Sequence, residues 1–245
     1  MDRWRNYLSP GEMPWLRGHE IQRQIIFPAA GFAVMALEAA RNLAPLEMTR
    51  LMEVQSLGIR KTLSFTDENA CVETTFTLSG IERAAGTRDD SSPAYATALF
   101  NCYACMNNDV GEFFSVASGK VKLTLGEPLV DALPARTNLV EHFVDTDVEF
   151  FYESLAALDY GYTGMFQGIT DLQRTNSGSK GSLTIPQEEA SDPQSWIIHP
   201  ATLDVGFQAV FAAVGAPGDG RLWTLHVSTL IDIHDEEGLQ TIVQV

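Results

Sequence analysis

The sequence predicts an α+β fold built from two similar halves, and three observations support this prediction. An alanine-rich apolar segment at residues 29–44 has the length of a helix, and four extended runs follow it. A second apolar helix is expected at residues 200–214. When Pro28 is aligned with Pro200, the segments PAAGFAVMALEAA and PATLDVGFQAVFAA carry alanines at the same offsets, which indicates an internal repeat.

The first half is expected to open with a turn-rich segment at residues 4–16 and a strand at residues 19–27. Pro28 suits the first turn of a helix, where its missing N–H costs no hydrogen bond, and Pro45 ends that helix. A polar loop is expected at residues 79–93. The extended runs alternate in part and are bounded by Gly, Asp, Asn or Pro, as antiparallel strands are; they cover residues 54–65, 70–79, 95–105 and 113–125.

Residues 126–138 contain two prolines and form the best candidate for a boundary between the halves. We therefore divide the chain into an N-terminal half, residues 1–130, and a C-terminal half, residues 131–245. The second half has fewer expected strands after its helix, so either its sheet is completed differently or the chain stops before the natural domain end. Its expected elements are a short helix at 147–158, strands at 162–175 and 181–185, the helix at 200–214, and strands at 222–233 and 239–245.

Composition excludes several classes of protein. The formal net charge of −16 argues against a nucleic-acid partner, because an acidic surface repels phosphates. The longest nearly uncharged apolar run, residues 25–37, is too short to cross a bilayer, and no basic segment precedes it as in a signal peptide. Three cysteines rule out a disulfide framework and suit a reducing compartment, so we expect a cytoplasmic protein without a membrane partner.

No set of residues has the spacing of metal ligands. Cys102 and Cys105 form a CxxC pair, but Cys71 is the only further cysteine and has no neighbouring histidine. The segment around the pair reads as a strand rather than as the helix start of a redox motif. We expect no metal; the remaining histidines without ligand-like spacing are His142, His226 and His234.

His19 stands just before the first helix, in a position suited to a catalytic base. The backbone N–H groups of Ala29, Ala30 and Gly31 lie at the positive end of that helix and can hold a carbonyl oxygen. Gly31 would also let a ligand approach the backbone closely. A base beside such a helix terminus suits removal of a proton α to a carbonyl, although a lone histidine is more often structural or exposed.

Asp204 and Gln208 lie one turn apart on the second helix. Apolar neighbours would desolvate the Asp204 carboxyl and raise its pKa, so it could stay protonated and act as an acid. Gln208 can hydrogen-bond that carboxyl in either protonation state. The alternative is an ordinary N-terminal acid that favours the helix dipole. His199, just before Pro200, is expected to anchor the start of the helix.

These residues resemble the signature motifs of polyketide synthase dehydratase domains. The segment from His19 to Pro28 resembles HxxxGxxxxP, and the segment from Asp204 to Gln208 resembles DxxxQ. WRNYLSPGEMPWLRGH, FFSVASGKV and GYTGMFQGI also resemble the fungal highly reducing iterative synthases, in matching order. The resemblance implies a double hotdog fold, in which two long helices are each wrapped by an antiparallel sheet, with an active site between the halves.

The same resemblance implies the reaction and the partners. A β-hydroxyacyl thioester on an acyl carrier protein would lose water and become a trans-enoyl thioester during polyketide chain reduction. The phosphopantetheine arm of the carrier would present the substrate, and no other cofactor is expected. The other domains of the synthase would be partners, and the protein would be a homodimer. Because carrier proteins are acidic too, we expect tethering rather than charge attraction to bring them together; Arg3, Arg5, Arg17 and Arg23 are scattered surface charges or a local landing site.

The resemblance also implies residue roles. His19 would take the α-proton, and Asp204, held by Gln208, would protonate the departing hydroxyl. The Gly31 amide would polarise the thioester carbonyl, and Tyr162 would assist the hydroxyl. Pro28 completes the first motif at the helix start.

Two departures keep other functions open. Arg23 replaces the motif glycine, where it could point to solvent or narrow the tunnel, and Met165 replaces a proline in the segment after Tyr162. One alternative is a product-template-like aldol cyclase of the same fold. The other is a catalytically silent hotdog domain that serves dimerisation or acyl binding.

Overall fold

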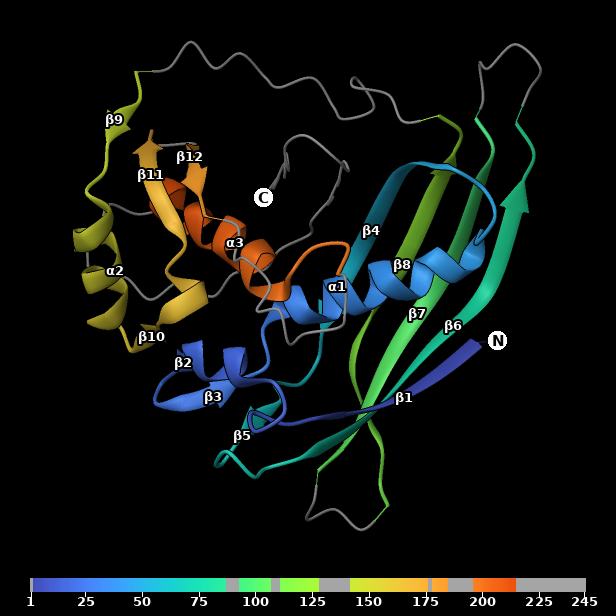
Figure 1. Ribbon diagram of the computed structural model, residues 1–245, viewed down its shortest axis with the longest axis horizontal. Coiled ribbons are helices and arrows are strands. Elements are labelled where there is room, and N and C mark those ends of the chain that lie inside the picture. The colour runs from blue at the N-terminus through green and yellow to red at the C-terminus, as the bar shows by residue number, and fades with distance from the viewer. Residues whose placement is uncertain are drawn as a thin grey trace.

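The computed structural model of the protein describes residues 2–86, 93–106, 111–127, 142–175, 178–184 and 196–214. Within these ranges the chain forms three antiparallel sheets and three α-helices, which confirms the α+β class (Figure 1). No helix in the described part of the chain is long and apolar enough to cross a membrane.

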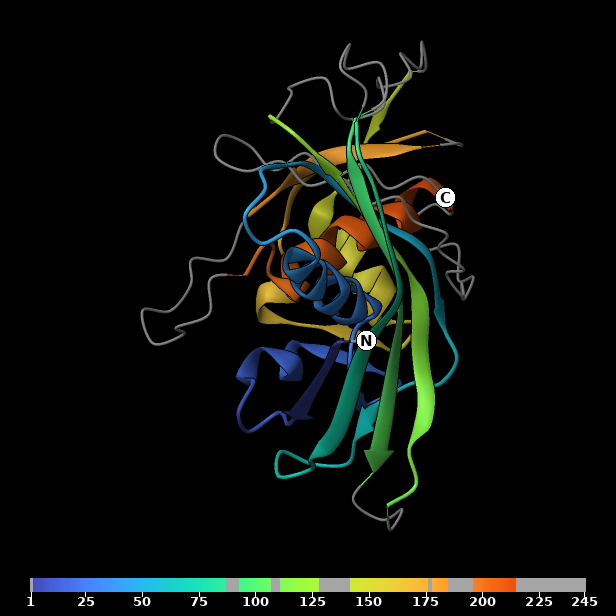
Figure 2. The ribbon, with the colours of Figure 1, turned by 90° about the vertical axis from the view of Figure 1, so that its right-hand side faces the viewer.

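The largest sheet belongs to the first half and supports the first long helix. Its strand order is β1-β6-β7-β8-β4, and every pairing is antiparallel; the strands are β1 (Asp2–Leu8), β4 (Thr49–Ile59), β6 (Val72–Ala84), β7 (Tyr95–Met106) and β8 (Phe114–Leu125). Helix α1 (Ala29–Ala40) crosses one face of this sheet and continues as a 3-10 turn, η2 (Arg41–Leu43) (Figure 2). Because α1 is apolar on nearly all sides, it is buried along most of its length.

A second sheet joins the two halves of the chain. Its order is β10-β2-β3-β5, from β10 (Tyr160–Tyr162), β2 (His19–Ile21), β3 (Gln24–Ile26) and β5 (Ser64–Phe65). Strand β10, from the second half, pairs with β2, from the first, and places Tyr162 opposite His19. The second half therefore reaches the strand that carries the candidate base.

The third sheet holds the second long helix. Its order is β12-β11-β9, from β9 (Val144–Asp145), β11 (Ile169–Arg174) and β12 (Ser179–Leu183). Helix α3 (Pro200–Val214) lies against β11 and β12, and α2 (Val148–Ala156) lies against β10 and β11. Two 3-10 turns, η1 (Pro14–Gly18) and η3 (Gly164–Phe166), contact each other beside β2 and β3.

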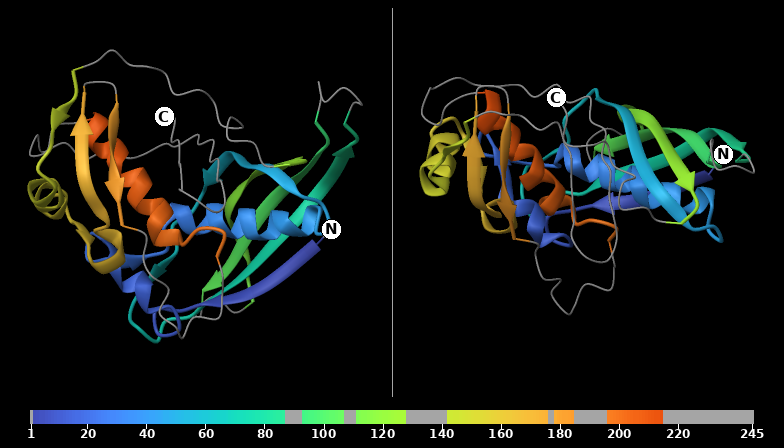
Figure 3. Two further views of the ribbon diagram at one scale, coloured as in Figure 1. Left: turned by 45° about the horizontal axis from the view of Figure 1, so that its top comes forward. Right: turned by 90° about the horizontal axis from the view of Figure 1, so that it is seen from above.

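Helix α3 lies between two hydrophobic cores. Leu203 and Phe207 belong to the core around α1, whereas Ala201 and Val205 belong to a second core around α2 and β11. The helices α1 and α3 meet near the centre of the molecule (Figure 3). The Glu38 carboxylate of α1 accepts a 2.7 Å hydrogen bond from the N–H of Ile197, which ties α1 to the segment before α3.

Some predicted elements differ from the structure at edges and turns. Residues 2–8 form an edge strand instead of the expected turns; most of its side chains are exposed, so the sequence lacks a clear apolar alternation there. Strand β6 continues past Ser79 to Ala84 through a bulge, into the expected loop. The predicted strand 162–175 is interrupted by η3. Cys102 and Cys105 both lie in β7, as expected.

The predicted strand 19–27 is a hairpin rather than one strand. Gln22 (φ 51°) and Arg23 (φ 61°) turn the chain with positive φ between β2 and β3. Positive φ at both central residues is the requirement of a tight hairpin turn, and glycine meets it most easily. Arg23 is exposed at this turn. The motif glycine is thus replaced at a position that turns the chain, and the arginine points to solvent.

The predicted strands at 222–233 and 239–245 lie outside the described residues, as does the predicted boundary between residues 130 and 131. These assignments stay predictions.

Replacing Arg23 by glycine is expected to stabilise the protein. The left-handed conformation disfavours a residue with a Cβ, so we expect a gain of about 1 kcal/mol, or about 2–4 °C in Tm, measured by thermal unfolding. Gln24→Gly is the matched control: Gln24 is also exposed but lies in extended β3, where glycine should destabilise. If both variants lost the same amount of Tm, the left-handed turn at Arg23 would be contradicted.

Candidate active site

His19 is buried at the start of β2, with one ring nitrogen fixed by the backbone. Its side chain is 8% exposed, and its Nδ1 lies 2.8 Å from the carbonyl oxygen of Ile26. A carbonyl oxygen only accepts, so Nδ1 carries the hydrogen and the lone pair of the neutral ring is on Nε2. The hairpin explains the contact, because it brings Ile26 back beside His19, seven positions earlier.

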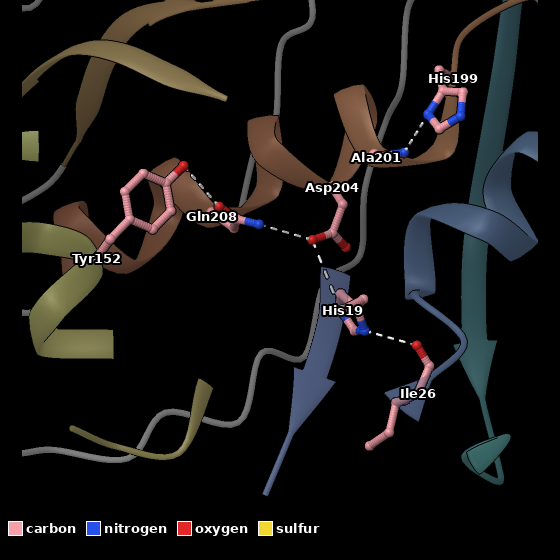
Figure 4. Close-up of polar contacts among 7 residues, drawn as sticks. All are labelled: His19, Ile26, Tyr152, His199, Ala201, Asp204 and Gln208. Carbon is pink, nitrogen blue, oxygen red and sulfur yellow. Dashed lines mark hydrogen bonds and ion pairs between the residues drawn. The ribbon is translucent and has the colours of Figure 1, made fainter. Parts of the chain in front are cut away.

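Asp204 faces the free side of that imidazole from α3. Its Oδ2 lies 3.8 Å from His19 Nε2, and Gln208 Nε2 donates a 3.1 Å hydrogen bond to the same oxygen (Figure 4). Asp204 and Gln208 are both buried. Burial raises the pKa of the Asp204 carboxyl, while the nearby His19 and the Gln208 hydrogen bond oppose that rise. The structure therefore brings a base and a desolvated acid together from opposite halves of the chain.

Aromatic side chains from the second half surround the imidazole. The rings of Tyr162 and Phe166 lie 5.4 Å and 5.1 Å from the His19 ring, centroid to centroid. Burial, followed by the nearby Asp204 charge, raises the pKa of the Tyr162 phenol well above its usual value, so it stays neutral. Met165 lies in η3 and packs, partly buried, against the second core. The methionine at the family's proline position thus leaves Tyr162 beside His19.

Gly31 serves packing in this structure, and its expected role beside a ligand stays a prediction. A Cβ at Gly31 would lie 2.5 Å from Cζ of the buried Phe27 ring, so that ring occupies the space. The N–H of Gly31 donates a 3.0 Å hydrogen bond to the carbonyl of Pro28, which is buried at the N-cap of α1. The amides of Ala29 and Ala30 precede it in the first turn, where a helix supplies no carbonyl partner of its own.

Two further polar contacts involve α3, one at its start and one between its middle and α2. Nδ1 of His199 accepts a 3.1 Å hydrogen bond from the N–H of Ala201, and its ring stands edge-on to Trp15. The expectation that His199 anchors the helix start is confirmed. Tyr152 was not predicted: its hydroxyl donates to Gln208 Oε1 at 3.2 Å. A tyrosine on the apolar face of the amphipathic α2 needs a buried polar partner, and that was the available signal.

The site's chemistry is that of an acid and a base. In the described part of the chain, no three His, Cys, Asp or Glu side chains gather as metal ligands. His19 Nε2 can accept a proton, and Asp204, when it is protonated, can supply one a few ångströms away.

Comparison with known proteins agrees with this arrangement. A family model described as the polyketide synthase dehydratase domain matches residues 1–88, and one described as the polyketide synthase dehydratase N-terminal domain matches residues 135–233. The hybrid PKS-NRPS synthetase buaA of Petromyces alliaceus is 44% identical over 94% of the chain. The highly reducing polyketide synthase verA of Penicillium polonicum is 41% identical over 94%. The chain spans only 6% and 8% of the length of these two relatives.

Solved structures establish the fold. The dehydratase domain from the CurK module of the curacin polyketide synthase has a TM-score of 0.72 and 19% identity, and the match covers 98% of this chain and 77% of that chain. Two further CurK dehydratase structures are of inactive mutants, one with an aspartate replaced by asparagine and one with a histidine replaced by phenylalanine. The predicted double hotdog fold is confirmed.

Asp204→Asn is expected to stabilise the protein at neutral and alkaline pH. The folded-state pKa is raised above the unfolded value, so keeping this carboxyl ionised in the folded protein costs free energy. The cost is full above the folded pKa and vanishes below the unfolded pKa of about 3.9. Thermal unfolding at pH 8 and at pH 4 should show a gain in Tm that narrows at the lower pH. If Asp204→Asn were less stable than the wild type at pH 8, the groups around Asp204 would favour its ionised form.

Gly31→Ala is expected to destabilise the protein by about 1–3 kcal/mol, because the new methyl group overlaps the Phe27 ring. Gly206→Ala, on α3, is the matched control: its Cβ meets nothing within 4 Å, so helix propensity should make it stabilising by about 0.5–1 kcal/mol. Denaturant unfolding measures the free energy of unfolding of both variants. An unchanged free energy in Gly31→Ala would mean that the Phe27 ring can move aside at little cost.

Proposed function

Because the chain belongs to the polyketide synthase dehydratase family, we propose that its His19 and Asp204 remove water from a β-hydroxyacyl thioester during polyketide chain reduction. The observation that carries the proposal is the buried pair itself, with His19 Nε2 3.8 Å from Asp204 Oδ2. The inactive CurK mutants, each lacking one histidine or one aspartate, support the choice of this residue pair.

The two side chains divide the reaction between them. His19 Nε2 removes the proton on the α-carbon, the Cβ–O bond breaks, and the electron pair of the C–H bond becomes the new Cα=Cβ bond. Asp204 gives its proton to the departing hydroxyl, which leaves as water. His19 is then protonated and Asp204 ionised, so one proton passed from Nε2 to the carboxylate restores the starting state. The neutral Tyr162 phenol, beside the imidazole, is a donor for the hydroxyl before it leaves.

Two further roles in the proposed reaction fall to Gln208 and to the start of α1. Gln208 holds the Asp204 carboxyl by its amide. The thioester carbonyl accepts from an amide of the first turn of α1, at Ala29 or Ala30, because the Gly31 amide is engaged by the Pro28 carbonyl.

The substrate reaches this site on an acyl carrier protein, through its phosphopantetheine arm, with no further cofactor. Among the four arginines near the start of the chain, Arg5 pairs with Glu73 and Arg17 pairs with Glu68. These pairs weaken any basic landing site, so tethering within one synthase supplies the effective concentration. We place the protein in the cytoplasm, as a homodimer, with the other synthase domains as partners.

The aldol cyclase and the silent hotdog domain remain the rival functions. A cyclase needs the same base but acts on a poly-β-ketone and releases water only after closing a ring. A silent domain needs no proton donor, and a buried carboxyl with a raised pKa would then be a cost without a use.

The direct test is incubation of the protein with a β-hydroxybutyryl pantetheine thioester and detection of the crotonyl product by mass spectrometry. We expect turnover that falls at least about 100-fold in His19→Phe and in Asp204→Asn. His142→Phe, a matched change at an exposed histidine, should retain full activity.

Three outcomes would contradict the proposal. Turnover that survives His19→Phe would remove His19 from the mechanism. An intact protein that is inactive on several chain lengths would indicate the silent domain. Cyclisation of a poly-β-ketone thioester would indicate the aldol cyclase.

A further inference from the structure

A chain of hydrogen bonds runs from the backbone of β11 to the candidate acid. The N–H of Ile169 donates to the Tyr152 hydroxyl at 3.2 Å, and that hydroxyl donates to Gln208 Oε1 at 3.2 Å. Gln208 Nε2 then donates to Asp204 Oδ2 at 3.1 Å. The three residues are at most 8% exposed, and Figure 4 shows Tyr152 approaching Gln208 from the side away from Asp204.

The hydrogen bonds in this chain share one direction, away from the backbone of β11. A backbone N–H can only donate, so the Tyr152 oxygen accepts from Ile169, and the Tyr152 hydroxyl donates its own hydrogen to Gln208. The end of Gln208 that receives this hydrogen must be the carbonyl Oε1. The amide Nε2 is therefore turned toward Asp204, and it can only donate.

From this geometry we propose that Tyr152 is a positioning residue for the dehydration, which fixes the amide orientation of Gln208 and so keeps the transferable proton of Asp204 on Oδ1. The inference rests on the proposed function of Asp204 as the acid. When Oδ2 accepts from Gln208, it is the carbonyl oxygen of the neutral carboxyl group, and the hydroxyl hydrogen stays on the other oxygen.

Without Tyr152 the amide of Gln208 is free to turn around. Its Oε1 would then accept the Asp204 hydroxyl hydrogen, and the proton needed by the leaving group would be held in a buried hydrogen bond. The titratable groups that face Asp204 are His19 from β2, Tyr152 from α2 and Tyr162 from β10. Gln208 lowers the pKa of Asp204 by donating to it, so loss of this bond should raise that pKa further.

Steady-state kinetics of Tyr152→Phe on the β-hydroxybutyryl thioester test the proposal. We expect kcat to fall about three- to ten-fold, with KM within about two-fold, because the change affects the proton and not substrate binding. The alkaline limb of the kcat profile should move to higher pH, since dehydration needs a protonated Asp204 and the carboxyl now loses its proton later. An unchanged kcat and an unchanged pH profile would overturn the proposal.

A double-mutant cycle shows whether Tyr152 acts through Gln208. In a Gln208→Leu background, Tyr152→Phe should change kcat by less than about two-fold, because there is no amide left to orient. If the two effects instead multiply, Tyr152 does not act through Gln208 and the proposal fails.

Leu155→Ala controls for a general loosening of α2. Leu155 is buried in the same helix but lies outside the hydrogen-bonded chain. It should lower Tm at least as much as Tyr152→Phe and leave the pH profile unmoved. A Leu155→Ala profile that shifts like that of Tyr152→Phe would reduce Tyr152 to a packing residue.

An NMR titration of the Asp204 side-chain carboxyl carbon separates this proposal from the proposed function. It needs no turnover, and Tyr152→Phe should raise the pKa of Asp204 relative to the wild type. A raised pKa in a protein that dehydrates nothing would uphold the orientation and overturn the function. An unchanged pKa would overturn the orientation whether or not the protein is active.

Discussion

The contact between His19 and Asp204 is the constraint on which the rest of the site depends. The two side chains come from a strand and a helix 185 positions apart in the sequence, and both are buried where they stand 3.8 Å from each other. Two devices hold them there. Strand β10 crosses from the second half to pair with β2, and α3 packs its Leu203 into one core and its Val205 into the other.

Burial of this acid is a stability cost that its proposed role as a proton donor explains. A carboxyl between two hydrophobic cores has a raised pKa, and the nearby His19 and one amide hydrogen bond from Gln208 reduce that cost. A stronger partner such as an arginine would favour the carboxylate and leave no proton to donate at neutral pH. The neutral amide of Gln208, itself bonded to Tyr152, orients the carboxyl and favours its ionised form less than a cation would.

The two residues that depart from the family motifs, Arg23 and Met165, do not displace the side chains of His19 and Asp204. Arg23 occupies a hairpin turn and is exposed, so its effect is local backbone strain. Met165 sits in a 3-10 turn whose neighbour Phe166 packs fully buried against His19. Both residues thus lie outside the set of side chains that contact Asp204.

The sequence alone determined the class of fold, both long helices and the four long strands of the first half, and it predicted His19, Asp204 and Gln208 as the candidate residues that the structure brings together. Apolar periodicity and motif spacing are local signals, and local signals are strong in these segments. Only the tertiary structure decided that residues 19–27 turn back on themselves, that Gly31 makes room for Phe27, and that Tyr152 contacts Gln208. Each of these features depends on contacts between segments that are far apart in the sequence or folded back on each other. The spacing of residues along the chain carries no information about such contacts.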